Sequence, residues 1–491
     1  MIQMMQRLKL SIARRPALEH QSRSAAALRL LGVLVAAACL TALTACQAGQ
    51  VEDPIGVMTA ADVTSAKRLK AARQAEKSHA DDPRRIDALR QYVFNAGHAL
   101  SLQQYAADEL LDYDEPRFRQ LFAEKLSAIN RWELRLNLLN RAVKNKWTEY
   151  TAGAVRTYAE PVRGYTDATR PERGIIAKLN PGQTVEDVIF HQFADTQGLD
   201  RHSDRVAAWE LLCRLEPTDE LVRKLQSVPT AGTALIGDLQ AAARDLRTVP
   251  VNREGVLWLS WLRGDAQRSY FAELRTAAAN LTTEQAAGLE LRHLPVLLAM
   301  DAAYRDQSRE QLLAALEART AGRDLNLRSP TWDGQPADHP QRLYDARDQL
   351  TWADLATVLT LDAMLHRPGA AATLFAQADA DRIDPTTEYG GVLDRTGFAR
   401  LYKPNVRQHD RKFIPSRQMI LDCYGGVAHY HFHAQSTQNG NYAGPGRGDL
   451  EFADRLQFNC LVITPIDSKR LGIDFYRHGS LVIDLGELHR P

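Results

Sequence analysis

Net charge is almost absent from this sequence. Its 491 residues include 61 Lys and Arg against 60 Asp and Glu. A chain so balanced has no overall field that would draw it to nucleic acid, which is therefore not among its predicted partners. Apolar residues make up 45% of the chain, which is typical of globular proteins and excludes wholesale disorder. A chain of this length accommodates two or three domains.

Long apolar runs are also scarce, and the one at residues 30–43 is too short for a bilayer core, since as a helix it would span about 21 Å. Basic residues precede it, as in a secretory signal. The segment Leu43-Thr-Ala-Cys46 that ends it resembles a bacterial lipobox. The resemblance implies cleavage before Cys46, a lipid anchor on its thiol and, because Gln47 is not Asp, an outer-membrane protein facing the periplasm. An ordinary signal peptide and an uncleaved membrane helix are the alternatives.

Cysteines are few, with five in the whole chain. Cys39 would leave with the signal and Cys46 would carry the lipid, so Cys213, Cys423 and Cys460 remain. An oxidising envelope permits a disulfide. Cys423 and Cys460 lie in strand-like runs and form the candidate pair, although buried free thiols fit the sequence equally well.

Most of the remaining chain has the periodicity of helices. Leu312 and Leu316 recur on one face, and Ser308-x-x-Gln311 and Thr282-x-x-Gln285 are capping boxes that open helices. The fold class predicted is a multidomain protein with a mostly α-helical N-terminal region, either a solenoid or an irregular bundle, followed by a small α/β domain. Its segments are a signal peptide at 1–45, a tether at 46–75, a helical domain at 76–375 and the α/β domain at 380–491.

The helical region has two predicted interruptions and one open question. Segments 161–181 and 330–340 are rich in Pro, Gly and charge and are expected to be long loops. The scattered charges of the helices are typical of solvated faces, and the alternative is that this region binds a protein partner.

The C-terminal segment contains short β-rich runs. They lie at 419–423, 458–464, 472–476 and 480–484, and a helix is expected to begin at Asp449.

His431 and His433 carry the strongest chemical signal. At a spacing of two residues they lie on one side of a strand, and Asp449 can supply a third ligand after a glycine-rich loop. Three protein ligands with an open position are typical of catalytic zinc, which also needs a proton carrier such as Glu388. The sequence therefore predicts a Zn²⁺ site with these four residues.

Two assignments stay open at this stage. His429 and His431 form an equally spaced pair, so His429 is either an alternative ligand or a neighbour of the ligands. Asp454 ranks second to Asp449, because five residues along a helix it faces about 140° away.

A cupin is a rival interpretation of Gly425-x5-His431-x-His433, but the Glu and the second motif of that family are missing.

The order of these residues resembles the JAB/MPN (JAMM) metalloprotease domain. The matching segments are Glu388-Tyr-Gly-Gly-Val-Leu393, Tyr430-His-Phe-His433 and Gly446-Arg-Gly-Asp449, and the resemblance covers residues 385–491. It implies zinc held by His431, His433 and Asp449, with Glu388 as the proton carrier. It also implies hydrolysis of a peptide or isopeptide bond in a peptide or protein substrate.

Three departures from that pattern define the second functional hypothesis. Ala434 replaces the usual Pro, the loop before Asp449 is longer, and Gly446 stands where the family has the Ser that helps to hold the oxyanion. Loss of one such donor typically costs about 100- to 1000-fold in rate. Ser436 or a backbone N–H of the loop could substitute. The first hypothesis is a lipid-anchored zinc peptidase, and the alternative is a catalytically inactive binding or scaffold lipoprotein.

Overall fold

The computed structural model describes residues 51–195, 199, 201–229, 233–327, 341–402 and 413–491. They form two compact units, one made of residues up to Phe122 with Ala128–Leu134, the other of Ala123–Ser127 and Arg135–Pro491. The predicted signal peptide, Cys46 and the predicted loop at 330–340 lie outside the described residues. None of the described helices is both long enough and apolar enough to cross a membrane.

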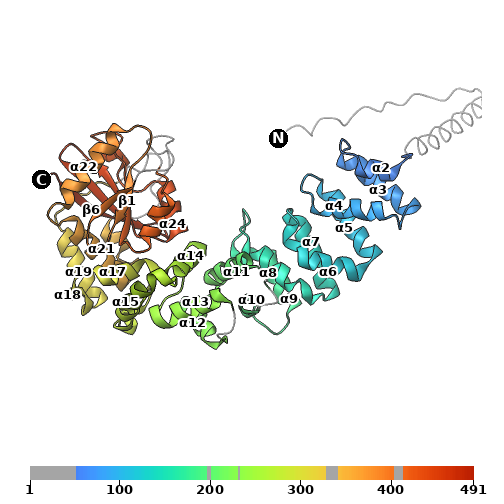
Figure 1. Cartoon of the computed structure of the whole chain (residues 1–491), viewed down its shortest axis with the longest axis horizontal. Helices are drawn as coiled ribbons and strands as arrows, with labels where there is room; N and C mark the ends of the chain where they lie inside the picture. The colour runs from blue at the N-terminus through green and yellow to red at the C-terminus, as the bar shows by residue number, and fades with distance from the viewer. Residues whose placement is uncertain (1–50, 196–198, 200, 230–232, 328–340, 403–412) are drawn as a thin grey trace, which may run out of the picture. The chain divides into compact units, whose positions relative to one another are not determined.

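Helices make up the first unit (Figure 1). They are α2 (Pro54–Thr59), α3 (Ser65–Ser78), α4 (Pro83–Phe94), α5 (Leu100–Tyr113) and the start of α6 (Glu115–Lys125). The prediction of a tether as far as residue 75 is wrong, because capped helices begin at Pro54 and Ser65. Asp53 accepts a hydrogen bond from Gly56 N, and Thr64 accepts one from Lys67 N, which satisfies N–H groups that a helix start leaves unpaired.

The second unit begins with a long run of helices, so the predicted helical region is confirmed. These are α7 (Trp132–Asn145), whose first three residues belong to the first unit, α8 (Thr151–Ala159), α9 (Pro171–Leu179), α10 (Val185–Ala194), α11 (His202–Leu215), α12 (Thr218–Ser227), α13 (Ala234–Ala241), α14 (Arg253–Leu262), α15 (Arg268–Ala279), α16 (Thr283–Ala286), α17 (Leu294–Ala299), α18 (Ala302–Arg305), α19 (Arg309–Thr320), α20 (Leu343–Ala346), α21 (Trp352–Leu365) and α22 (Ala370–Ile383). Both predicted capping boxes are present. The loop expected at 161–181 is wrong in part, because α9 starts inside it with Pro171 at a first-turn position that favours Pro.

A mixed six-stranded sheet follows, so the predicted α/β region is also confirmed. Its elements are β1 (Gly390–Leu393), β2 (Ala399–Tyr402), α23 (Arg417–Cys423), β3 (Ala428–Phe432), α24 (Arg447–Leu456), β4 (Cys460–Pro465), β5 (Arg470–Arg477) and β6 (Leu481–His489). The strand order is β2-β1-β3-β4-β5-β6, and β3 pairs with β4 in parallel while the other pairs are antiparallel. An open sheet with a helical crossover is not the jelly roll of a cupin, so that rival is excluded.

Two expectations for this region are corrected. Residues 419–423 belong to α23 and not to a strand, because Ser416 caps the helix at Met419 N and the buried pair Met419 and Cys423 has helical spacing. The pairing of Cys423 with Cys460 is also wrong. Both are buried free thiols, and burial raises the pKa of each above its ordinary range.

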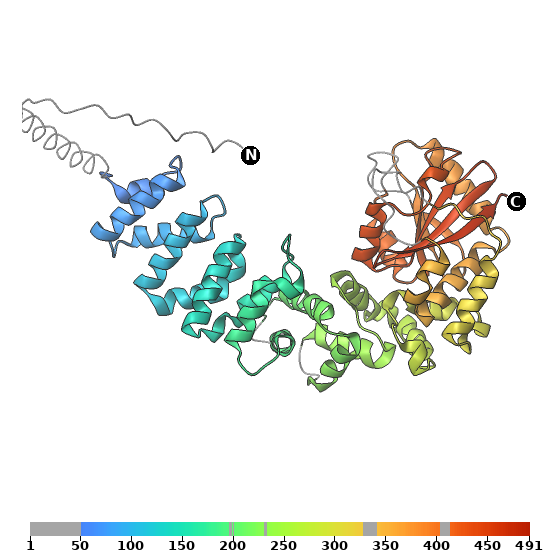
Figure 2. The same cartoon turned by 180° about the vertical axis from the view of Figure 1, so that it is seen from behind.

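Helices cover both faces of the sheet (Figures 1 and 2). Tyr430, which points to one face, donates a hydrogen bond to Gln377 of α22. Its neighbours His429 and His431 point to the opposite face, where α24 packs on β5. The two histidines are therefore enclosed between the sheet and α24.

A buried ion network joins the strands to the preceding helices. Arg292 donates to Asp354 of α21 at 2.7 Å and to Asn459, directly before β4, at 2.8 Å. Arg477, at the end of β5, also donates to Asp354, at 3.1 Å. Burial opposes the charge of Asp354, but Arg292, His293 and Arg477 hold the pKa of its carboxyl well below the ordinary value.

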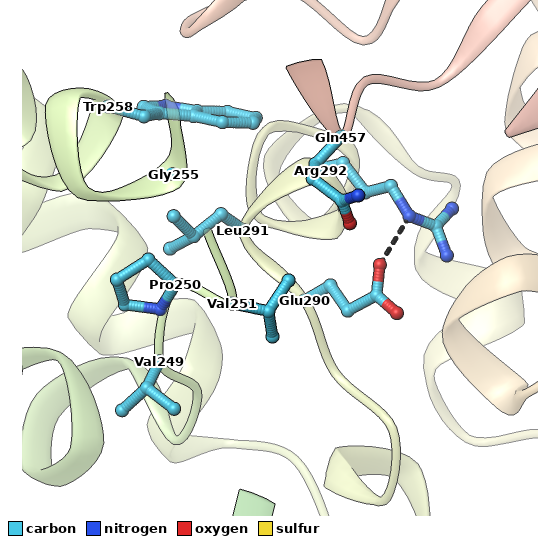
Figure 3. A pocket seen from close by; sticks show the side chains of 9 residues that line it. All are labelled: Val249, Pro250, Val251, Gly255, Trp258, Glu290, Leu291, Arg292 and Gln457. Atoms are coloured by element: carbon cyan, nitrogen blue, oxygen red, sulfur yellow. Dashed lines mark hydrogen bonds and ion pairs between the residues drawn. The ribbon is translucent and has the colours of Figure 1, made fainter. Parts of the chain in front are cut away.

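A small pocket marks the same junction (Figure 3). The ion pair of Glu290 and Arg292 lies beside it, Trp258 of α14 forms another wall, and Gln457 reaches it from the end of α24. Its volume of about 20 Å³ has room for a water molecule and little more. Helices and sheet are therefore closely packed at this junction.

Removal of the Asp354 carboxylate should destabilise the second unit strongly. Asp354→Ala removes one of the two countercharges of the buried Arg292, which keeps only Glu290, and also removes the partner of Arg477. We expect a loss of about 3–5 kcal/mol in the free energy of unfolding. The control is Asp265→Ala, which removes the exposed pair with Arg268 and should change it by less than about 1 kcal/mol. Chemical denaturation followed by circular dichroism measures both. Equal effects of the two variants would contradict the importance of the network.

Candidate metal centre

The histidines of β3 lie on one face of the sheet because side chains alternate along a strand. His431 is paired with Gly390 on one side and with Val462 on the other. His433 follows the last residue of β3, and its N–H donates to Ile463 O at 3.0 Å. The strand pairing thus continues as far as His433 and fixes both imidazoles at the carboxyl end of β3.

Asp449 comes to the same place from the first turn of α24. Gly446 is the N-cap residue, and its N–H donates to Asp449 Oδ2 at 2.7 Å. The preceding loop is fixed by Gly444, whose N–H donates to Asp474 of β5 at 2.9 Å and whose φ of +81° favours glycine. The crossover between two parallel strands therefore delivers the carboxylate to the histidines.

The three side chains form a group that could hold a metal ion. Their ligand atoms all lie within 4.8 Å of one another. His431 Nε2 is 3.3 Å from His433 Nε2 and 3.3 Å from Asp449 Oδ1, and His433 Nε2 is 3.4 Å from Asp449 Oδ2. Bonds of about 2.0–2.1 Å from a tetrahedral ion place its ligands about 3.3–3.4 Å apart, which matches this triangle.

The electrostatics of the group suit a cation. Burial disfavours charge on both His433 and Asp449, but the interactions between the imidazoles and the carboxylate are stronger. Asp449 raises the pKa of His433 to about 9, and His431 followed by His433 holds the pKa of the Asp449 carboxyl well below its usual value. A divalent ion can bind between a carboxylate and two imidazoles by replacing the proton that the group would otherwise hold.

His433 is also fixed from behind. Its Nδ1 lies 2.9 Å from the carbonyl oxygen of Tyr442, which can accept a hydrogen bond from that nitrogen. Such a bond holds the proton on Nδ1 and leaves Nε2, the atom that faces Asp449, free to bind metal.

Glu388 lies just before β1, the antiparallel neighbour of β3. Phe432 N donates to Tyr389 O, so the antiparallel register of β1 and β3 places Glu388 opposite His433 and on the same face. Glu388 is 6% exposed, and burial raises the pKa of its carboxyl although His433 and His431 oppose the shift. The sequence-predicted proton carrier and ligands thus come together from three different elements.

A pocket of about 470 Å³ opens onto this group. Most of the residues that line it are of polar or charged types, and they are Glu388, His433, Gln435, Ser436, Gln438, Asn439, Tyr442, Gly446, Arg447, Gly448 and Asp449. The predicted candidates Glu388, His433 and Asp449 are therefore accessible to a small molecule or a peptide segment.

The remaining candidates lie elsewhere or have other contacts. His429 stacks on His431 with ring centroids 5.6 Å apart, its Nδ1 is 3.2 Å from Gly391 O, and burial lowers its pKa to about 3. It is a neutral neighbour of the ligands and lies outside the triad. Asp454 accepts a hydrogen bond from Gly479 N at 2.8 Å and is not part of the group.

Both predicted oxyanion donors are already engaged. The N–H of Gly446 donates to the ligand Asp449, and Ser436 Oγ donates to Gln438 O at 2.8 Å. The structure places both residues at the pocket without making either an uncommitted donor.

Two residues that the sequence did not indicate have direct contacts here. Gln435 Nε2 donates to Glu388 Oε1 at 3.1 Å, and Asn439 Nδ2 donates to Gln435 Oε1 at 2.7 Å. Their only signal is their position in the loop between His433 and Asp449, and amide side chains in loops are too common to stand out.

No protein-family model, curated protein or solved structure matches this chain.

Loss of either ligand should remove the metal. The full-length protein, purified without chelators, is expected to hold about one divalent ion per chain, and His433→Ala or Asp449→Ala should lower the content at least about 10-fold. Elemental mass spectrometry measures it. Asp454→Asn is the matched control and should keep the ion. Equal metal content in all four proteins would show that the triad binds none.

Proposed function

We propose that this protein is a zinc metallopeptidase that hydrolyses a peptide or isopeptide bond. The observation that carries the proposal is the triangle of ligand atoms, 3.3, 3.3 and 3.4 Å on its sides. Two of its residues, His433 and Asp449, line one pocket with the buried Glu388. The predicted lipid anchor on Cys46 would place it in the bacterial envelope. That location is a prediction that the described residues do not test.

The donor set supports zinc as the metal. Two imidazole nitrogens and one carboxylate oxygen are ligands that Zn²⁺ accepts in tetrahedral catalytic sites, and three of them leave a position open. His431, His433 and Asp449 would hold the ion, which in such sites acts as a Lewis acid and makes water a nucleophile near neutral pH.

Glu388 would carry the proton. Burial raises its pKa above the ordinary value of a glutamate, which suits a group that must accept and release a proton in one cycle. Its carboxylate takes a proton from the attacking water, the carbonyl carbon gains the hydroxyl, and the proton passes to the leaving amine nitrogen as the C–N bond breaks. The products are a carboxylate and an amine.

The placement of the motifs supports the likeness to the JAB/MPN domain. In that pattern the Glu precedes the paired histidines, the histidines end a strand, and the Asp opens a helix. Here Glu388 precedes β1, His433 ends the pairing of β3, and Asp449 lies in the first turn of α24. This agreement is in the order and local structure of the residues, and no overall match accompanies it.

A second function has its own supporting observation. Gly446 lacks the hydroxyl of the family pattern, and its N–H and the Ser436 hydroxyl are committed to other acceptors. A zinc-bearing binding or scaffold module without catalysis needs no oxyanion donor. The helical region would then provide the surface for a protein partner.

Neutralising Glu388 separates the two functions. Glu388→Gln keeps the shape of the side chain but cannot accept the proton, so hydrolysis should fall at least about 100-fold while the metal stays bound. Internally quenched peptides and lysine-branched isopeptides measure the rate. Glu310→Gln, at an exposed position of α19, is the control and should be as active as the parent. Undiminished cleavage by Glu388→Gln would exclude the mechanism, and a metal-loaded parent without hydrolysis favours the binding module.

Restoring a serine tests the role of the missing donor. Gly446 has a φ of −78°, and a Cβ there would come no closer than 3.4 Å to Asp449 Oδ2, so Gly446→Ser fits without strain. A serine at the N-cap should also stabilise α24 by a few tenths of a kcal/mol. If the oxyanion lacks a donor, the turnover number should rise at least about 10-fold. Gly448→Ser, two residues on in open space, is the control. A lower turnover number in Gly446→Ser would contradict this reading.

A further inference from the structure

The side chains of Gln435 and Asn439 connect the metal ligand His433 to the carboxylate of Glu388. Asn439 Nδ2 donates to His433 O and to Gln435 Oε1, both at 2.7 Å. Gln435 Nε2 then donates to Glu388 Oε1 at 3.1 Å. All three links lie at the wall of the pocket.

The donors and acceptors of this chain determine how each amide is oriented. The two atoms that accept hydrogen bonds from Asn439 are the carbonyl oxygens of His433 and Gln435, so the NH₂ group of Asn439 must face them. The carbonyl of Gln435 is taken by Asn439, and its NH₂ group must therefore face Glu388. A carboxylate can only accept in its ionised form, which agrees with the last link.

The backbone holds the start of this chain in place. Asn439 N donates to Pro465 O at the end of β4 at 2.9 Å, and Tyr442 N donates to Asn439 O at 2.8 Å. Tyr442 O in turn is the partner of His433 Nδ1. The loop that follows β3 is thus fastened to the sheet, to the metal ligand and, through Gln435, to Glu388.

We propose that Gln435 is a positioning residue that fixes the Glu388 carboxylate beside the metal, and that Asn439 holds Gln435 in the required orientation. The inference rests on the proposed function, in which Glu388 carries the proton. With Oε1 held by Gln435, the plane of the carboxylate is fixed and Oε2 is the oxygen that takes up the proton. A carboxylate with free rotation would spend part of its time out of reach.

A metal-directed probe tests this without knowledge of the substrate. Acetohydroxamic acid binds a catalytic metal through two oxygens and gives up a proton to a nearby base. Its dissociation constant for the full-length, cobalt(II)-loaded protein can be followed by the visible absorption of the cobalt ion. Gln435→Ala should weaken binding about 10-fold, which is typical of the loss of a hydrogen bond to a charged group, and the cobalt content should not change.

The double-mutant cycle distinguishes positioning from a structural role. If Gln435 acts through Glu388, then Gln435→Ala in the Glu388→Gln background should change the affinity by less than about 2-fold. A structural role would weaken binding equally in both backgrounds. Gln418→Ala, on α23 outside the pocket lining, is the control and should match the parent.

Asn439→Asp is the second variant. An aspartate cannot donate to Gln435 Oε1, so the Gln435 amide is no longer held. The affinity for acetohydroxamic acid should therefore fall, as it does in Gln435→Ala. Equal losses from Gln435→Ala in both backgrounds, or no loss from either variant, would overturn this inference and leave the proposed function intact. A metal-loaded parent that does not bind the hydroxamate would overturn both.

Discussion

The parallel pairing of β3 with β4 is the constraint on which the candidate metal centre depends. Parallel neighbours cannot be joined by a tight turn, so the chain must leave the sheet and return through a crossover, here α24. The crossover begins at the carboxyl end of β3, where the paired histidines end, and its first turn carries Asp449. Ligands in open α/β sheets lie at this end of the strands for the same topological reason. The antiparallel partner β1 brings Glu388 to the same end from the other side.

Asp449 shows how one residue serves both fold and site. Its Oδ2 accepts the N–H of Gly446, which satisfies a donor that the start of α24 would otherwise leave unpaired. The same carboxyl group lies 3.3 and 3.4 Å from the two imidazoles. The positive end of the helix dipole also stabilises its charge. The position of Asp449 in the site is therefore compatible with a stable start of α24. The Gly446 N–H, which donates to Asp449, is however not available to an oxyanion.

The sequence was sufficient for those parts of the site that follow from spacing. Two histidines two residues apart on a strand must share a face, and an acidic residue at the start of the helix that follows their loop is within reach, so the triad could be predicted. Gln435 could not, because its role depends on which way a loop folds and on an amide orientation that only the hydrogen-bond network decides. The strand expected at 419–423 failed for a related reason. Its apolar residues suit a strand as well as a helix, and the cap at Ser416 decides between them.

The buried network around Arg292 explains why the metal centre and the preceding helices form one unit. Asn459 accepts from Arg292 through its side-chain oxygen and donates to Val427 O through its amide, while its own carbonyl accepts from His429 N. A charged side chain from the helical run is thus two hydrogen bonds away from the strand that carries the histidines. An unpaired charge at that depth would be costly, so a displacement of these helices also has to move the start of β3. The helical run therefore acts as a support for the strand that carries the histidines.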